Sequence, residues 1–377
     1  MQKKLIALAV AGLASTGAFA QSNVTVYGVA DAYVGSFKTD NMERSTQVNS
    51  GGLGASRIGF KGVEDLGNGL KALFVMEYKI DLDQNGGIGS NFSSGAQTAN
   101  GSGPARQQMV GLTGGFGTAV AGRLQTAGYD WQQKVDVLGG TAIDPLGNVG
   151  AGDRFLIGST SAFLRRGDNA IAYISPSFGG VTVALNRAYA AEESGAKDLN
   201  KNTIANLISV SYEAGPLYVG GVYANAKGEG VNGSNVAIDT VDQREWALGA
   251  AYDFKVVKVN ASYQSNKNKL AVGALDAQNT AWNIGAAVPV SAAGTIVASY
   301  AQAKLKQVAV DENKIKSWTL AYTHALSKRT TAYAGYTQIN RDDAISAGTY
   351  TPVGTTVAAT NFGADTTAFV AGVNHKF

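Results

Sequence analysis

The chain contains no cysteine, so it can form no disulfide, hold no thiolate-bound metal and offer no cysteine nucleophile. Histidine occurs only twice in 377 residues, which leaves little for the usual metal and acid–base sites. Proline occurs 6 times, and no proline-rich linker divides the chain. Charged residues make up 16% of the chain, against roughly 25% in soluble domains. These absences argue against a disulfide scaffold and most metalloenzymes. The near balance of 31 basic and 28 acidic residues argues against a nucleic-acid-binding protein.

The first twenty residues have the pattern of a secretory signal peptide. Lys3 and Lys4 precede an apolar run over residues 5–14, and the segment ends in Ala18-Phe-Ala20. The alternative is a membrane anchor, but the apolar run is too short to span a bilayer. We expect cleavage after Ala20 and a mature domain of residues 21–377. Its 29 basic and 28 acidic residues would give a net charge of +1.

The rest of the chain lacks a convincing apolar run of 18 residues, so any membrane-spanning structure must be made of strands. Apolar and polar residues alternate in many short segments, such as residues 70–80 and 245–253. This period of two is typical of strands with one apolar face. We count sixteen such strands, which start near residues 24, 51, 70, 105, 118, 166, 181, 203, 217, 244, 257, 278, 295, 316, 330 and 366.

The connections between these strands alternate in length. Short ones, such as residues 114–117 and 325–328, alternate with long polar ones, such as residues 83–104 and 341–363. Short turns at one end, long loops at the other and an even strand count are typical of outer-membrane barrels. We therefore predict an all-β fold, a 16-stranded antiparallel transmembrane β-barrel. The alternative is a soluble β-sandwich or propeller, whose polar face usually carries more charge.

A barrel of this size encloses more space than side chains can fill, so its lumen should hold water. A charge that faces lipid at mid-depth costs roughly 2–4 kcal/mol, so charged strand residues should face the lumen. We expect this lining to include Asp31, Arg57, Lys61, Lys71 and Glu77. Aromatic residues near strand ends would form an interface girdle, among them Tyr27, Tyr33, Tyr78, Tyr252 and Trp282.

One stretch, from Arg123 to Arg166, lacks the sustained alternation of the other segments. Arginines stand at both of its ends, and aspartates lie between them at positions 130, 136, 144 and 153. We predict that part of this stretch folds inside the barrel, where it sets the width and the charge of the opening.

Several segments, taken in order, resemble the general porins of Gram-negative outer membranes, and most closely their β-proteobacterial branch. The matching pieces span nearly the whole mature chain: VTVYGVAD at 24–31, SRIGFKGVEDLG at 56–67, VGLTGGFG at 110–117 with Gly122-Arg123, RGDN at 166–169, YISPSFG at 173–179 and HKF at 375–377.

This resemblance implies a homotrimer of sixteen-stranded barrels, each with its own pore and without a cofactor, in contact with the lipid bilayer and lipopolysaccharide. It implies an inward-folded loop 3 opposite wall arginines at positions that match Arg57, Arg123 and Arg166. The family's loop-3 segment Pro-Glu-Phe-Gly-Gly is absent, and residues 142–147 stand in its place. Asp136 or Asp144 would then be the opposing acid.

The resemblance also assigns roles to two segments outside the pore. The terminal Phe377 matches the residue read by the barrel-assembly machinery during biogenesis. Residues 83–104 match the loop that latches onto a neighbouring subunit.

We therefore predict an outer-membrane channel for passive diffusion of ions and small hydrophilic solutes. Three wall arginines would outweigh the nearby acids, so the pore should prefer anions. A channel specific for a sugar or an organic anion is the alternative, and a row of lumen aromatics would favour it. We expect no enzyme activity, because His324 and His375 have no acid and nucleophile at a telling spacing.

Overall fold

The computed structural model describes residues 23–84, 88, 105–150, 155–157, 165–189, 200–231, 237–269, 277–307, 312–343 and 363–377. The predicted signal peptide and its cleavage after Ala20 lie outside the described residues, as does most of the connection at 83–104.

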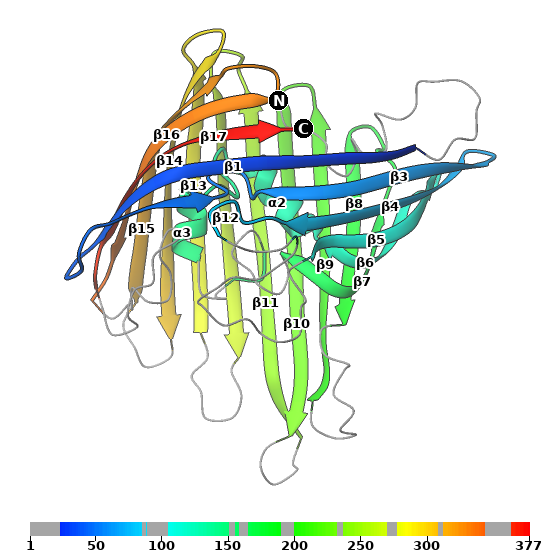
Figure 1. The fold of residues 1–377 in the computed structure, drawn as a ribbon. Helices are drawn as coiled ribbons and strands as arrows, with labels where there is room; N and C mark the ends of the chain where they lie inside the picture. The colour runs from blue at the N-terminus through cyan, green and yellow to red at the C-terminus, as the bar shows by residue number, and fades with distance from the viewer. Residues whose placement is uncertain are drawn as a thin grey trace.

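The strands form one sheet of antiparallel neighbours (Figure 1). Their bounds are β1 (Asn23–Thr39), β2 (Ser45–Ser50), β3 (Arg57–Gly67), β4 (Leu70–Lys79), β5 (Ala105–Gly114), β6 (Gly117–Gln125), β7 (Arg166–Ile174), β8 (Val181–Tyr189), β9 (Asn200–Ala214), β10 (Leu217–Val231), β11 (Ala237–Asp253), β12 (Lys258–Lys269), β13 (Ala277–Pro289), β14 (Gly294–Gln307), β15 (Asn313–Ala325), β16 (Thr330–Arg341) and β17 (Thr366–Lys376).

The sheet closes on itself because β1 pairs with the last strand. Val29 lies opposite Lys376 and Thr39 opposite Thr366, while the first residues of β1 pair with β3. The short β2 pairs with β1 beyond that point. The strand expected to start near residue 51 is β3, which begins at Arg57, and β2 is an additional strand in the stretch 38–50, which we expected to be a loop. A turn follows β2 at Gly51, whose φ of 89° suits glycine. The predicted closed 16-stranded barrel is confirmed, with one additional strand.

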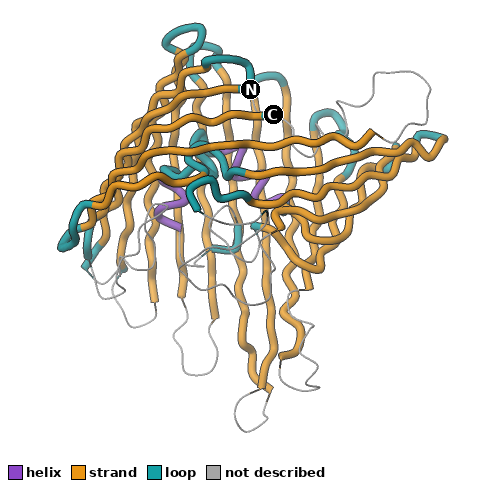
Figure 2. Tube along the Cα trace, in the orientation of Figure 1, coloured by secondary structure: helices purple, strands orange, loops and turns teal. Residues whose placement is uncertain are grey.

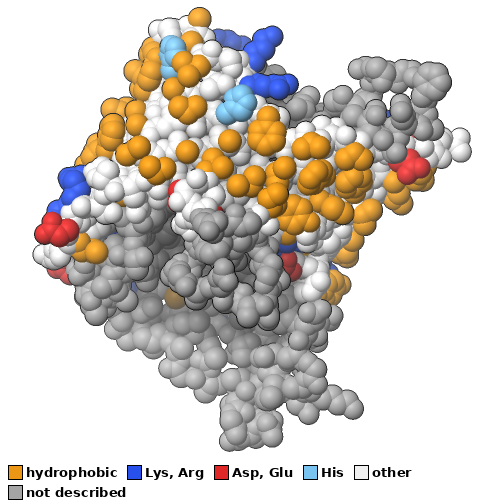
Figure 3. Space-filling model, in the orientation of Figure 1, with side chains coloured by type: hydrophobic (Ala, Val, Ile, Leu, Met, Phe, Trp, Pro, Cys, Tyr) orange, Lys and Arg blue, Asp and Glu red, His pale blue; other side chains and the backbone are white. Residues whose placement is uncertain are grey.

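Large apolar side chains alternate outward along the strands, as bilayer contact requires. Val110, Leu248 and Leu320 are each more than half exposed outside, whereas their sequence neighbours face inward. Figure 3 shows hydrophobic side chains gathered on the outer surface. Two expected girdle residues face inward instead. Tyr33 is only 2% exposed in an inner apolar cluster, and Tyr27 hydrogen-bonds to a lumen carboxylate.

Two short helices lie within the ring of strands: α2 (Ala127–Val135) and α3 (Pro145–Gly150) (Figures 1 and 2). Both belong to the stretch without alternation, which here is called loop 3 and defined as residues 126–165. Helix α2 contacts strands β8–β12, and α3 contacts β13–β16. The predicted inward fold of loop 3 is therefore confirmed. None of the described helices is long and apolar enough to cross a membrane.

Candidate functional site: a constriction inside the barrel

Loop 3 packs on the inner wall through its apolar residues. Thr126 caps helix α2 by accepting the backbone N–H of Tyr129 at 3.4 Å. Trp131 and Val135 then point away from the lumen and join a buried cluster with the inward-facing Leu207 of β9 and small residues of β10 and β11. A helix of nine residues is marginal in isolation, so this packing stabilises its position.

Inward-facing glycines on the wall leave the room that loop 3 occupies. A Cβ at Gly249 would lie 2.8 Å from Val135, and one at Gly335 would lie 2.5 Å from Ile143. The same close approach occurs between Gly220 and Trp131, at 3.0 Å. Because packed carbon atoms lie about 3.5–4.0 Å apart, side chains at these positions would push the loop further into the lumen.

Hydrogen bonds from the wall fix the loop backbone. The Trp131 indole donates to the carbonyl of Gly220 at 2.9 Å. The Thr319 hydroxyl donates to the carbonyl of Ile143 at 2.7 Å. Further along, Glu245, which is 1% exposed, accepts the backbone N–H of Leu156. These hydrogen bonds therefore attach loop 3 to the wall at helix α2, just before helix α3, and again at Leu156 after α3.

A group of arginines gathers on the opposite part of the wall around one acid. The Nε of Arg106 lies 2.6 Å from Glu77, and the Nε of Arg57 lies 3.3 Å from the other oxygen of that carboxylate. The Tyr27 hydroxyl donates to Glu77 at 3.1 Å. Glu77 is 4% exposed, so these contacts satisfy a buried carboxylate.

Two further arginines face the same place from the end of loop 3 and the start of β7. Arg165 and Arg166 lie over the ring of Tyr129, at 5.5 and 5.2 Å from its centre. Burial by itself raises the pKa of the Tyr129 phenol, but the four guanidinium groups of Arg165, Arg166, Arg106 and Arg57 together hold that pKa below its ordinary value. The phenol of α2 therefore lies in the field of all four, which are called the arginine cluster here.

The third predicted wall arginine makes different contacts. Arg123 lies at a register shift in β6 and pairs with Asp168 and the carbonyl of Ala105. No described contact joins it to the arginine cluster, and its role at the opening stays a prediction.

The predicted lumen residues separate into distinct environments. Lys61 lies over the ring of Tyr27, at 5.2 Å from its centre, and the hydroxyl of that tyrosine donates to Glu77. Lys71 is six residues before Glu77 on the same face of β4, which places it roughly 20 Å away toward the short turns.

Asp31 is an anchor rather than an open lumen charge. It is 0% exposed and accepts the backbone N–H groups of Gly52, Leu53 and Gly54 at 2.8–3.0 Å. It also accepts the Tyr333 hydroxyl at 2.6 Å. The expectation of a water-facing carboxylate is corrected, because the chain between β2 and β3 folds over it.

The two expected constriction acids are also buried. Asp136 and Asp144 are 4% and 3% exposed and lie next to each other within loop 3. Asp136 accepts the N–H of Leu138, and Asp144 accepts those of Gly140 and Gly147. Burial raises the pKa of both carboxyl groups, and the neighbouring Asp144 raises that of Asp136 further. We therefore revise the expectation that these two carboxylates face the arginines. They accept backbone N–H groups in and next to the turn that joins the two helices.

The sequence alone missed three participants in the cluster. Alternation from the exposed Val110 would turn Arg106 outward, but a register shift between β4 and β5 brings it to Glu77. Arg165 and Tyr129 depend on the path of loop 3, which has no periodic signal. The only sequence feature that pointed to Arg165 was its position next to Arg166, which was itself a predicted constriction residue. Among the described residues, no group of three His, Asp or Glu could hold a metal ion.

The chain matches the family model for Gram-negative porins over residues 7–344. It is 31% identical to outer membrane porin protein 32 of Delftia acidovorans over the full length of both chains. It is 27% identical to an outer membrane porin protein of Bordetella pertussis, covering 89% of this chain and 93% of the relative.

Solved structures agree with this relationship. An anion-selective porin from Comamonas acidovorans superposes with a TM-score of 0.74 at 28% identity, covering 95% of this chain and 100% of that one. A Salmonella typhi OmpF structure, at 18% identity and a TM-score of 0.64, shares the fold. The chain belongs to the Gram-negative porin family, and it is an outer-membrane β-barrel that forms a channel for the passive diffusion of small hydrophilic solutes.

Proposed function

We propose that the channel prefers anions and that the arginine cluster sets this preference. The observation that carries the proposal is the charge balance at the constriction. Four guanidinium groups act on Tyr129, and Glu77 is the carboxylate that contacts two of them, Arg57 and Arg106, directly. The excess positive charge there favours entry of small anions and repels cations.

The chemistry of arginine suits this role. A guanidinium stays charged at every physiological pH, so the field across the opening does not depend on the protonation of these groups. Loop 3 narrows the passage, and a narrow opening between low-dielectric walls strengthens the interaction of a passing ion with fixed charges. Polar solutes align in that field, whereas apolar solutes must displace ordered water.

The comparison with solved structures supports the same conclusion. The similar protein from Comamonas acidovorans is described as anion-selective, and it covers 95% of this chain.

The test is the reversal potential of the purified protein in a planar bilayer under a KCl gradient. We expect the native channel to give a reversal potential of the sign that marks chloride preference. In the double variant Arg106→Gln with Arg165→Gln, this reversal potential should shift toward zero. Lys255→Gln is the matched control, because Lys255 lies at a short turn with its side chain 84% exposed. A clear cation preference of the native channel would refute the proposal.

The partner and processing predictions remain proposals that rest on the resemblance: a homotrimer, cleavage after Ala20, and recognition of Phe377 by the barrel-assembly machinery. Phe377 supports the last, because it exchanges two backbone hydrogen bonds with Gly28 at the seam and its side chain is 47% exposed. Chain-end sequencing of the mature protein, its mass under native conditions and the folding yield of Phe377→Ala test these proposals separately.

A further inference from the structure

Lys376, the last residue of β17, is a further cation on the inner face of the barrel. The large apolar residues Phe369 and Val373 of this strand are exposed on the outside. Successive side chains of a strand point to opposite faces, so Lys376 leaves the sheet on the side away from them. Its ammonium group therefore belongs to the lumen.

The residues on either side of Lys376 fix this direction. Asn374, which is buried on the same face, donates a hydrogen bond to the Asp31 carboxylate at 2.7 Å inside the barrel. Phe377 exchanges two backbone hydrogen bonds with Gly28 of β1, at 3.0 and 3.2 Å. The side chain of Lys376 is therefore oriented by the seam at which the barrel closes.

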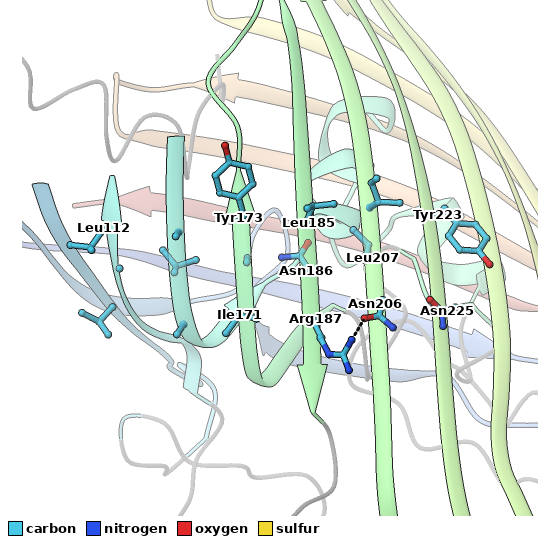
Figure 4. Close-up of a pocket in the computed structure, with 17 residues that line it drawn as sticks. Leu112, Ile171, Tyr173, Leu185, Asn186, Arg187, Asn206, Leu207, Tyr223 and Asn225 are labelled. Atoms are coloured by element: carbon cyan, nitrogen blue, oxygen red, sulfur yellow. Dashed lines mark hydrogen bonds between the residues drawn. The ribbon is translucent and has the colours of Figure 1, made fainter. Parts of the chain in front are cut away.

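Other strand cations face away from the lumen. Arg187 of β8 has the same parity as the exposed Leu185 and points to the outside, where it donates a hydrogen bond to Asn206 at 3.3 Å (Figure 4). A cation on that face is separated from the water of the pore by the wall. Lys376 lies on the inner face, which it shares with Arg57.

The strand pairing places Lys376 next to Arg57. Val29 of β1 lies opposite Lys376 on one side and opposite Arg57 of β3 on the other. The three residues form one row, in which the Cα atoms of the two cations are roughly 10 Å apart. Arg57 is the charged group that acts on the Lys376 ammonium. The positive field of the arginine cluster therefore continues across the seam to Lys376.

The charge of Lys376 is less compensated than that of its neighbours. Arg57 and Arg106 both pair with Glu77, at 3.3 and 2.6 Å. Lys376 is less deeply buried than Arg57. In the part of the chain that the structure describes, no carboxylate pairs with its ammonium. Its full charge is therefore available to a passing anion.

Lys376 also lies on the short-turn side of the arginine cluster. Its backbone N–H donates to the carbonyl of Arg329 in the short turn between β15 and β16, at 2.9 Å. Arg57, in contrast, lies at the end of β3 that is farther from the short turn. An anion that crosses the constriction toward the short turns therefore passes Arg57 and then Lys376.

We propose that Lys376 is a specificity-determining residue of the channel, which receives anions from the arginine cluster on the side of the short turns. This inference rests on the proposed anion preference and extends it beyond the constriction. Conduction requires sites that an ion can both enter and leave, and a second cation lets the anion move on without a direct step into bulk water.

The experiment uses the absence of cysteine from the chain, because Lys376→Cys then provides a single thiol. The assembled channel is measured in a planar bilayer under a KCl gradient before and after labelling. One methanethiosulfonate reagent carries an ethylammonium group and another carries an ethylsulfonate group. We expect the positive label to restore the native reversal potential and the negative label to shift it toward cation preference.

The single-channel conductance in dilute KCl gives a second readout of the same labels. The two labelled forms should differ at least about twofold, because a unit charge within roughly 10 Å of the ion path changes the local ion concentration by about that factor in water. This difference should shrink at high salt, where fixed charges are screened.

Lys328→Cys is the matched control, because Lys328 is an exposed cation in the short turn that also contains Arg329. Neither label should move its reversal potential from the native value. Two variants test Lys376 without labelling. Lys376→Arg keeps the charge and should behave as the native channel, whereas Lys376→Met should shift the reversal potential toward zero. Circular dichroism of each purified variant shows that the barrel is folded.

The outcomes separate this inference from the proposed function. A native channel that prefers cations would refute the anion preference itself. A native channel that prefers anions, but whose reversal potential changes neither with the labels at position 376 nor in Lys376→Met, would overturn the role of Lys376 alone. A thiol at position 376 that neither reagent reaches in the folded channel, or an equal effect of the labels at position 328, would overturn it as well.

Discussion

The Nε of Arg106 on β5 lies 2.6 Å from Oε1 of Glu77 on β4, and this contact places an unexpected arginine inside the barrel. The other Glu77 oxygen is 3.3 Å from Arg57. Glu77 therefore holds two guanidinium groups together that would otherwise repel each other. The charge of the opening depends on this one buried acid as much as on the arginines.

Glu77→Gln should increase the preference for anions, because it removes the negative charge in direct contact with the arginine cluster. It should also destabilise the barrel by about 3 kcal/mol, since removing one partner of a buried ion pair leaves the others uncompensated. Reversal potentials and thermal unfolding followed by circular dichroism measure the two effects. Glu64→Gln, an exposed change at the end of β3, is the control and should alter neither. An unchanged selectivity in Glu77→Gln would contradict the assignment of the cluster.

The selectivity should vary with pH through Asp130 in the first turn of α2. Burial raises its pKa to about 6, while Gln125, Lys134 and Arg166 act in the opposite direction. Below pH 6 the carboxyl is neutral, and above it a negative charge appears near Arg166. The anion preference should therefore fall as the pH rises from 5 to 7.

Reversal potentials at a series of pH values check this prediction. Asp130→Asn should hold the low-pH selectivity throughout, while Asp253→Asn, at a short turn, should keep the native pH dependence. A native channel whose selectivity stays constant between these pH values would exclude Asp130 as the titrating group.

Gly249→Val should push loop 3 toward the lumen. The added Cβ alone would lie 2.8 Å from Val135, and the wall cannot move outward without breaking its strand pairing. We expect a lower single-channel conductance and a lower unfolding midpoint. Gly115→Ala is the control, because nothing lies within 4 Å of its added Cβ. Native conductance in Gly249→Val would show that the loop is not held against this strand.

Asp31→Ala should destabilise the barrel by about 3–5 kcal/mol, because three backbone N–H groups and the Tyr333 hydroxyl lose a charged acceptor. Unfolding in detergent with increasing denaturant measures the loss. Asp65→Ala removes a carboxylate that accepts one exposed N–H, that of Gly67, and should cost far less. Equal losses in the two variants would mean that Asp31 does not anchor the chain between β2 and β3.

The sequence by itself determined the wall. Alternation of apolar and polar residues is a local property of each strand, so it identified the barrel and the inward face of Arg57 and Glu77. It also identified the outward apolar face, except that Tyr27 and Tyr33 of the expected girdle face inward. It also marked loop 3 as the exception, because that stretch lacks the period of two.

Only the tertiary structure decided which charges meet at the opening. A one-residue register shift reversed the direction of Arg106, and the path of loop 3 brought Arg165 and Tyr129 into the cluster. The same path buried Asp136 and Asp144 beside each other. These outcomes depend on contacts between residues far apart in the chain, and no local periodicity encodes them.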